Sequence, residues 1–268
     1  MGFLGFWGNY YTVRYNNFIK IDTVRLDIFL ASHYQTTRNR AQFWIDSGLV
    51  FVNAKTVTKA SYQVSEMDTI ELMNDKRTEW VSRSAVKLDD FLEANKIIIG
   101  WFQCLDVGSS TGGFTQVLLS RWAQKIVAVE IGTNQLHEKL QWDPRIESHE
   151  QTDIRDYAKI SQKDESFQKF NLIVGDISWC PLRDILPSII PLLKQGGSII
   201  LLYKPQFEVS PKELTKGWVV HRNIDTQKML HEEVLFWKEK FWIKLKKMSQ
   251  STLAGEAGNE EYLVWITL

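Results

Sequence analysis

Single charged residues follow several short apolar runs of this chain. Each run is typical of a buried strand, and the charged residue comes at its end or soon after it. These residues are Asp106, Glu130, Asp153, Asp176 and Lys204. Ligands of doubly wound sheets bind outside the carboxyl ends of the strands, so we expect the five side chains to share one site. Carboxylates and a lysine there could bind a ribose or an amine, or help a hydroxyl to lose its proton.

The first of these strands leads into a glycine-rich turn over residues 108–113, and a helix-like segment follows. This order is typical of nucleotide-binding loops. The outer glycines have the spacing of a phosphate-binding P-loop, but Phe114 stands where that loop needs its lysine. Ser110 replaces the second glycine of the dinucleotide fingerprint, and Asp106 would repel a pyrophosphate. The turn therefore suits a ligand with a positive, amine-bearing end and no phosphate, such as S-adenosylmethionine.

Many glycine turns bind nothing, and Glu130 is the residue that favours a ligand-binding turn here. It lies 22 residues after Gly108, and doubly wound folds place a ribose-binding carboxylate about 20 residues on. We therefore predict a site for S-adenosylmethionine. Its residues are Asp106, Gly108, Ser109, Ser110, Gly112, Gly113, Phe114, Glu130, Asp153 and Asp176.

The part of the chain that holds these residues alternates strand-like and helical segments. A helix is expected over residues 82–95, and the strands are expected at 102–107, 126–129, 145–148, 170–175, 198–203, 242–249 and 261–268. Helical segments between most of the strands favour a parallel sheet that is covered on both faces. The short connection between the last two strands favours an antiparallel pair. The predicted fold is α/β, a doubly wound seven-stranded sheet that is parallel except for one antiparallel edge strand.

A smaller α+β unit precedes this sheet. Helical spacing over 25–32 and 37–47 is followed by short strand-like runs at 49–52, 56–57 and 68–72. A polar stretch, residues 74–79, then separates the two patterns. We divide the chain into an extension (1–22, expected to be mobile or loosely docked), a small domain (23–75), a linker (76–81) and the large α/β domain (82–268).

The net charge is zero, so bulk electrostatics predict no polyanionic partner. The small domain is nevertheless basic, with seven Lys and Arg against three Asp between residues 14 and 59. Charge alone is equally typical of a solvated face. Residues that could contact RNA phosphates are Arg25, Arg38, Arg40, Lys55 and Lys59.

Other classes of protein are disfavoured. Cys104 and Cys180 fall in or beside apolar runs, as buried thiols of a reducing compartment do, and neither they nor the five histidines have metal-binding spacing. No apolar run approaches the roughly 18 residues of a membrane span, and the first residues do not match a signal peptide. We expect a cytoplasmic protein without a metal and without a membrane partner.

The small domain carries a resemblance. The segments RLDIFL and TTRNRAQFWIDSGLVFVNAKTVTKASYQVSEMDTIEL resemble the RNA-binding domain shared by small-subunit ribosomal protein four, many pseudouridine synthases and bacterial tyrosyl-tRNA synthetases. This resemblance makes RNA binding the favoured interpretation of the basic residues.

The rest of the chain resembles the FtsJ-like RNA 2′-O-methyltransferases. With the small domain in front, it is similar to the TlyA, or hemolysin A, family of ribosomal RNA cytidine 2′-O-methyltransferases. The matching blocks are VSRSAVKL, CLDVGSSTGGFT, QTDIRD, GDIS, LYKPQFE, KGWVV and GNEEYL. The resemblance implies S-adenosylmethionine as cofactor and ribosomal RNA or ribosomal subunits as partner. It also implies a catalytic tetrad of Lys87, Asp176, Lys204 and Glu261, with Glu260 as the alternative to the last.

A ribose 2′-hydroxyl is a weak nucleophile until its proton is drawn away. Lys204 could take that proton only when neutral, and lowering its pKa from about 10.4 towards 7 costs roughly 4–5 kcal/mol. Lys87 and desolvation would favour this change, whereas Asp176 and Glu261 would oppose it. Lys204 is therefore expected to be a base or an orienting donor. A catalytically silent RNA-binding protein and a membrane-damaging hemolysin are the competing hypotheses.

Overall fold

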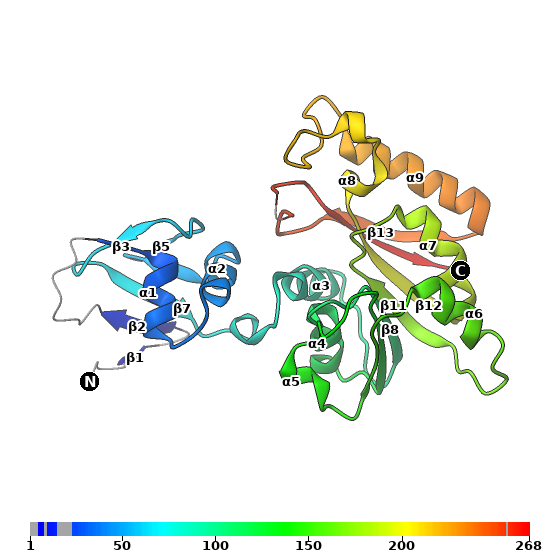
Figure 1. The fold of residues 1–268 in the computed structure, drawn as a ribbon, viewed down its shortest axis with the longest axis horizontal. Coiled ribbons are helices and arrows are strands. Elements are labelled where there is room, and N and C mark those ends of the chain that lie inside the picture. The colour runs from blue at the N-terminus through cyan, green and yellow to red at the C-terminus, as the bar shows by residue number, and fades with distance from the viewer. Residues whose placement is uncertain (1–4, 8–9, 15–22, 256) are drawn as a thin grey trace. The chain divides into compact units, whose positions relative to one another are not determined.

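The structure is a computed structural model that describes residues 5–7, 10–14, 23–255 and 257–268 (Figure 1). The chain divides into two compact units, residues 1–83 and 84–268. Each unit has its own sheet and its own buried core.

Two helices form the centre of the first unit, α1 (Leu26–His33) and α2 (Arg38–Asp46). They pack on each other through apolar side chains at helical spacing, and Leu26, Leu30, Ala41 and Ile45 are fully buried. The segment that follows the last strand forms a short 3-10 helix, η1 (Lys76–Glu79). The small α+β fold expected before the large sheet is confirmed.

The strands of the first unit form an antiparallel sheet in the order β1-β2-β7-β4-β5. They are β1 (Gly5–Trp7), β2 (Tyr10–Arg14), β4 (Val50–Val52), β5 (Lys55–Thr56) and β7 (Thr69–Met73). A separate pair consists of β3 (Val24–Arg25) and β6 (Gln63–Val64). Asn53 and Ala54 join β4 to β5 with φ of 51° and 61°, as a two-residue hairpin turn requires.

Part of the extension pairs with the sheet of the first unit. Residues 1–22 were expected to be mobile or loosely docked; among those that the structure describes, β2 pairs with β7 from Tyr10↔Met73 to Arg14↔Thr69. Aromatic and β-branched residues in β2 favour a strand, and the edge of β7 offers unpaired backbone groups to bind it. Residues 1–4, 8–9 and 15–22 lie outside the described residues.

The second unit is built on a seven-stranded sheet in the order β10-β9-β8-β11-β12-β14-β13. Its strands are β8 (Gln103–Val107), β9 (Lys125–Val129), β10 (Ile146–His149), β11 (Phe170–Gly175), β12 (Leu193–Tyr203), β13 (Lys244–Gln250) and β14 (Tyr262–Thr267). Only β14 runs against its neighbours. The predicted fold class is confirmed, and the reversed strand lies second from the edge, between β12 and β13.

Helices cover both faces of this sheet (Figure 1). One face carries α3 (Arg83–Ala94), α4 (Gly113–Ser120) and α5 (Glu138–Gln141). The other carries α6 (Ile154–Ser161), α7 (Leu182–Ile189) and α9 (Thr226–Phe241). Shorter helices lie in the connections, η2 (Ile190–Leu192), α8 (Pro205–Glu208) and η3 (Pro211–Glu213). The fully buried Trp237 of α9 packs in the core of the second face with side chains of β11 and β12. None of the helices in the described part of the chain combines the length and the apolar character needed to cross a bilayer.

Four tryptophans of the second unit have a left-handed backbone. Trp101, Trp122, Trp218 and Trp242 have φ between 58° and 66° and are 63–85% exposed. This region disfavours side chains by about 1–2 kcal/mol per residue and is typical of glycine. Trp122 and Trp242 lie at the ends of α4 and α9, where glycine often ends a helix.

We expect Trp122→Gly and Trp242→Gly each to raise the free energy of unfolding by about 0.5–1 kcal/mol. Relief of the left-handed strain exceeds the roughly 0.5–1 kcal/mol that glycine costs through the entropy of the unfolded chain. Urea denaturation of each variant measures the change. Trp142→Gly is the control, because Trp142 is 88% exposed but has φ of −107°. An equal gain in the control would contradict the assignment of strain.

Candidate active site

The glycine turn uses most of its backbone N–H groups internally. Gly108 and Ser109 both donate to the carbonyl of Val129, at 2.9 and 3.2 Å, and Gly112 donates to that of Ser109 at 2.8 Å. The Ser110 N–H donates to Glu130 Oε2 at 2.9 Å. The four N–H groups are therefore not directed at a phosphate, in agreement with the exclusion of a P-loop.

Two glycines of the turn are required by space as well as by conformation. Gly112 has φ of 89°, and a Cβ there would lie 2.4 Å from Leu140 Cδ1. Gly108 has φ of 72°, and its Cβ would lie 3.3 Å from the carbonyl oxygen of Asp176. The turn is thus closely packed between α5 and the loop after β11.

Glu130 lies at the end of β9 beside this turn and is 8% exposed. Its Oε1 accepts from the Gly132 N–H at 2.7 Å while its Oε2 accepts from Ser110. Each carboxylate oxygen has two acceptor positions, so both oxygens can still bind a hydroxyl. The geometry suits a ribose diol.

Four other predicted cofactor residues lie in the turn or next to it in the chain. Asp106 is fully buried, and its Oδ2 accepts from the Thr115 hydroxyl at 2.6 Å. Its Oδ1 is buried without a hydrogen-bond partner among the described residues. Burial raises the pKa of Asp106 to about 7. Phe114 is 2% exposed, Gly113 starts α4, and Ser109 is 6% exposed, so these residues shape the turn from inside.

Asp153 caps the N-terminus of α6 by accepting from the Arg155 N–H at 2.8 Å. It also forms an ion pair with the Arg155 guanidinium at 2.5 Å. The guanidinium lies 4.9 Å from the centre of the Trp179 ring. Arg155 thus joins the loop after β10 to the loop after β11, a role that sequence reasoning missed although Arg155 belongs to the block QTDIRD.

The four tetrad positions form two ion pairs. Lys204 Nζ lies 2.5 Å from Asp176 Oδ1, and Lys87 Nζ is bound to Glu261 Oε2. The register Tyr203↔Tyr262 between β12 and β14 brings the residues next to these two tyrosines, Lys204 and Glu261, to adjacent strands. All four side chains are less than 20% exposed. The site is therefore charge-balanced and largely closed to water.

Glu261 and Glu260 have different surroundings. Glu260 is exposed and accepts hydrogen bonds from the Thr226 and Tyr262 hydroxyls at 2.7 and 2.9 Å. Glu261 is 4% exposed and faces Lys87. Glu261, and not its neighbour, is therefore the glutamate that pairs with Lys87.

Two residues that sequence reasoning missed lie near Glu261. A Cβ at Gly255 would lie 2.6 Å from Glu261 Oε1, so a larger residue there would displace the carboxylate from its position. Asn259 is buried; its Oδ1 accepts from the Val220 N–H at 3.0 Å and its Nδ2 donates to the Trp218 carbonyl at 2.8 Å. These bonds join the blocks KGWVV and GNEEYL. Val220 and Asn259 are 39 residues apart in the chain.

The predicted RNA-binding residues of the first unit fall into two groups. Arg25 and Arg38 both bind the fully buried Asp27, at 2.9 and 2.8 Å, and their guanidinium groups hold the pKa of Asp27 well below its usual range. Arg40 donates to the carbonyls of Thr78 and Trp80.

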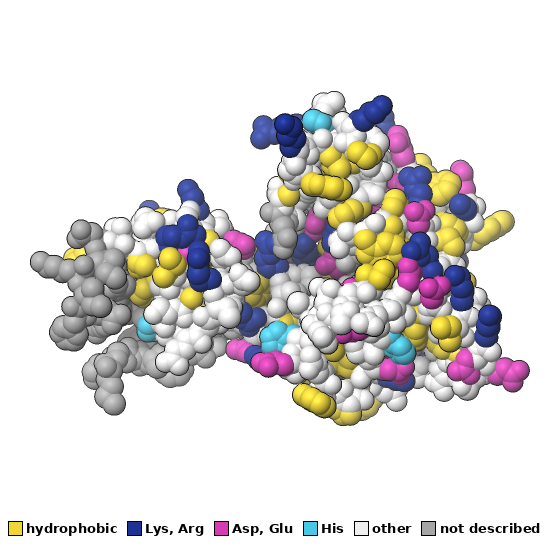
Figure 2. Space-filling model, viewed as in Figure 1, with side chains coloured by type: hydrophobic (Ala, Val, Ile, Leu, Met, Phe, Trp, Pro, Cys, Tyr) yellow, Lys and Arg dark blue, Asp and Glu magenta, His cyan; other side chains and the backbone are white. Residues whose placement is uncertain are grey.

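Lys55 and Lys59 are exposed and show no ion pair within the described residues. Figure 2 shows Lys and Arg side chains gathered on the visible face of this unit. The arginines therefore stabilise the unit, and these two lysines are the predicted residues most open to a phosphate.

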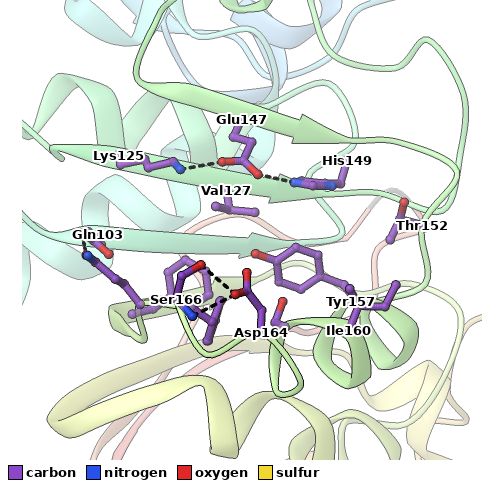
Figure 3. Close-up of a pocket in the computed structure, with 14 residues that line it drawn as sticks. Gln103, Lys125, Val127, Glu147, His149, Thr152, Tyr157, Ile160, Asp164 and Ser166 are labelled. Carbon is purple, nitrogen blue, oxygen red and sulfur yellow. Dashed lines mark hydrogen bonds and ion pairs between the residues drawn. The ribbon is translucent and has the colours of Figure 1, made fainter.

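A cavity of about 600 Å³ lies apart from the tetrad, between the strands β9 and β10 and the helix α6 (Figure 3). Glu147 binds Lys125 and His149 across its floor, each at 2.6 Å. None of the predicted cofactor or catalytic residues lines it.

Comparison with known proteins assigns the family. Residues 80–268 match the FtsJ-like methyltransferases and residues 24–70 match the S4 domain. The chain is 36% identical over 264 residues to the 23S rRNA (cytidine-2′-O)-methyltransferase TlyA of Campylobacter jejuni, with 90% of this chain and 98% of that protein covered.

It is 33% identical over 230 residues to the 16S/23S rRNA (cytidine-2′-O)-methyltransferase TlyA of Mycobacterium tuberculosis, with 86% and 84% covered. A solved structure of a candidate hemolysin from Streptococcus thermophilus superimposes with a TM-score of 0.66 at 28% identity, with 91% and 88% covered. The chain belongs to the FtsJ-like methyltransferases and, within them, to the TlyA, or hemolysin A, family.

Proposed function

We propose that this chain transfers a methyl group from S-adenosylmethionine to the 2′-hydroxyl of a cytidine ribose in ribosomal RNA. The observation that carries the proposal is the pair of ion pairs, Lys204–Asp176 and Lys87–Glu261, at the strand ends beside the glycine turn. The names of the curated relatives support the same reaction and the same nucleotide.

The residues of the turn fit this cofactor. Four of its N–H groups bond within the protein, so it suits a ligand without phosphate, and Glu130 can accept the hydroxyls of a ribose. Asp106 Oδ1 is a buried acceptor without a partner among the described residues, close below the turn. When bound, S-adenosylmethionine supplies a methyl group that its positive sulfur already activates.

The tetrad residues then need to orient the ribose and accommodate its proton. Lys204 would face the 2′-hydroxyl, either accepting the proton when neutral or holding the oxygen as an ammonium donor. Asp176 Oδ1 lies 2.5 Å from Lys204 Nζ, so this ion pair orients the lysine side chain. Lys87 and Glu261 balance each other's charge and border the hydroxyl. Positioning of this kind supplies much of the acceleration of a group transfer.

Glu130→Gln is expected to raise the Kd for S-adenosylmethionine about 10- to 100-fold. Hydrogen bonds to a charged group are worth about 1.5–3 kcal/mol each, and the amide would direct its NH2 group towards a backbone N–H. Isothermal titration calorimetry measures the change. Glu147→Gln is the matched control, since Glu147 lies in the separate cavity. An unchanged Kd in Glu130→Gln would contradict the assignment of the ribose site.

The S4 domain would dock the RNA, with Lys55 and Lys59 on the phosphates. The function is tested by transfer of a labelled methyl group from S-adenosylmethionine to isolated small and large ribosomal subunits, with nuclease mapping of the product. Both subunits are needed, because the two TlyA relatives are named for 23S and for 16S/23S rRNA. A 2′-O-methylcytidine is expected; failure to label either subunit would favour a catalytically silent RNA-binding protein.

A further inference from the structure

The Asp176–Lys204 ion pair joins two separate loops. Asp176 starts the loop from β11 to α7, and Lys204 comes directly before α8 at the end of β12. The 2.5 Å separation of the two side chains depends on how the loops are held relative to each other. Displacements of about 1 Å in such a site can lower a rate 100-fold, so a contact that fixes these loops has catalytic consequences.

Glu208 makes a contact of this kind. α7 follows Pro181, whose side chain cannot accept a hydrogen bond, and the helix therefore has no cap of its own. Glu208, at the end of α8, accepts from the N–H of Leu182 at 2.9 Å through its Oε1. A carboxyl group at a helix N-terminus also interacts favourably with the helix dipole. α8, which follows Lys204 directly, thus caps the helix that follows Asp176.

The surroundings of Glu208 show that it acts here as a hydrogen-bond acceptor. Its Oε2 is buried and has no hydrogen-bond partner within the described part of the chain. Burial raises the pKa of the carboxyl to about 7. The neighbouring Arg183 forms its ion pair with Glu233. A neutral side chain of the same length with an acceptor oxygen could therefore replace Glu208.

We propose that Glu208 is a positioning residue for methyl transfer, because its hydrogen bond to the N-terminus of α7 sets the distance between the loops of Asp176 and Lys204. The inference rests on the proposed function. Glu208 belongs neither to the tetrad nor to the predicted cofactor residues, and its acceptor oxygen, rather than its charge, is the necessary feature.

Two variants of similar shape test this inference. Glu208→Gln keeps an acceptor for the Leu182 N–H, whereas Glu208→Met does not. We expect Glu208→Met to lower kcat for methyl transfer to ribosomal subunits about 10- to 100-fold, and Glu208→Gln to retain at least about a third of it. The Kd for S-adenosylmethionine should change less than about threefold in both, because the glycine turn is not altered.

Glu232→Met is the control for an acid-to-methionine change, since Glu232 lies exposed on α9. Equal kcat values in Glu208→Gln and Glu208→Met would overturn the inference, whether both were high or both low. A parallel loss of cofactor binding in Glu208→Met would overturn it too, because the residue would then act on the fold as a whole. Wild-type protein that methylates neither subunit would instead refute the proposed function.

Discussion

Lys204→Ala is expected to lower kcat for methyl transfer about 10²- to 10⁴-fold, the range typical of a lost proton-transfer group. Of the two tetrad lysines, Lys204 is the one that pairs with Asp176. Its Nζ also lies 5.9 Å from the centre of the Phe207 ring. The alanine variant leaves the glycine turn and Glu130 unchanged. The Kd for S-adenosylmethionine should therefore stay within about threefold of wild type.

Single-turnover methylation of ribosomal subunits measures this effect, with Lys212→Ala as the control because Lys212 is an exposed lysine of η3. The pH profile of the wild type separates the two roles of Lys204. If Lys204 is the base, kcat should rise with pH until the ammonium group has lost its proton. If Lys204 acts as an ammonium donor, kcat should fall over the same pH range. Methyl transfer that survives Lys204→Ala would refute the active-site assignment.

Lys87→Met is expected to lower the free energy of unfolding of the second unit by about 3–5 kcal/mol. The reason is that it leaves the carboxylate of Glu261 buried without its cation, and breaking one side of a buried pair has a cost of this size. The side chains of Lys87 and Glu261 are only 10% and 4% exposed. Methyl transfer should be lost as well. Chemical denaturation of the full chain measures the change in the free energy of unfolding. The signal that is followed must report on the second unit.

The double variant Lys87→Met with Glu261→Leu separates stability from catalysis. Replacing a whole buried ion pair with apolar side chains is often neutral or stabilising, so most of the lost stability should return while methyl transfer stays absent. Lys228→Met is the control: the exposed pair Lys228–Glu232, at 3.9 Å, should contribute less than about 1 kcal/mol. A double variant that regained activity would show that the pair is structural only.

The alternation of strands and helices in the second unit was predictable because its signals are local. Strand-like runs of four to eight residues, with helical segments between most of them, predicted all seven strands to within a few residues, although β12 starts at Leu193 and not at 198. Glycine spacing, Phe114 and Ser110 were enough to exclude a phosphate loop. The placement of β2 on β7 was not predictable, because strand pairing depends on which edges remain free.

The partners of charged side chains were also not predictable from the sequence. The sequence predicts Arg25, Arg38 and Arg40 as RNA contacts but does not show what they bind within the protein: two of them bind the buried Asp27 and the third binds backbone carbonyls. A charge has no periodicity that reveals its partner. Lys87 and Glu261 are 174 residues apart in the chain.

The α/β fold, the glycine turn without phosphate contacts and the edge of the sheet at which charged residues gather could be read from the amino-acid sequence, because periodicity and spacing act over a few residues. The family was indicated by the resemblance of whole motif blocks. Three contacts required the folded structure: Glu261 and not Glu260 meets Lys87, Asn259 joins two distant blocks, and Glu208 caps α7. Such contacts depend on the register of β12 with β14 and on the packing of loops, where angstrom differences determine which polar atoms meet.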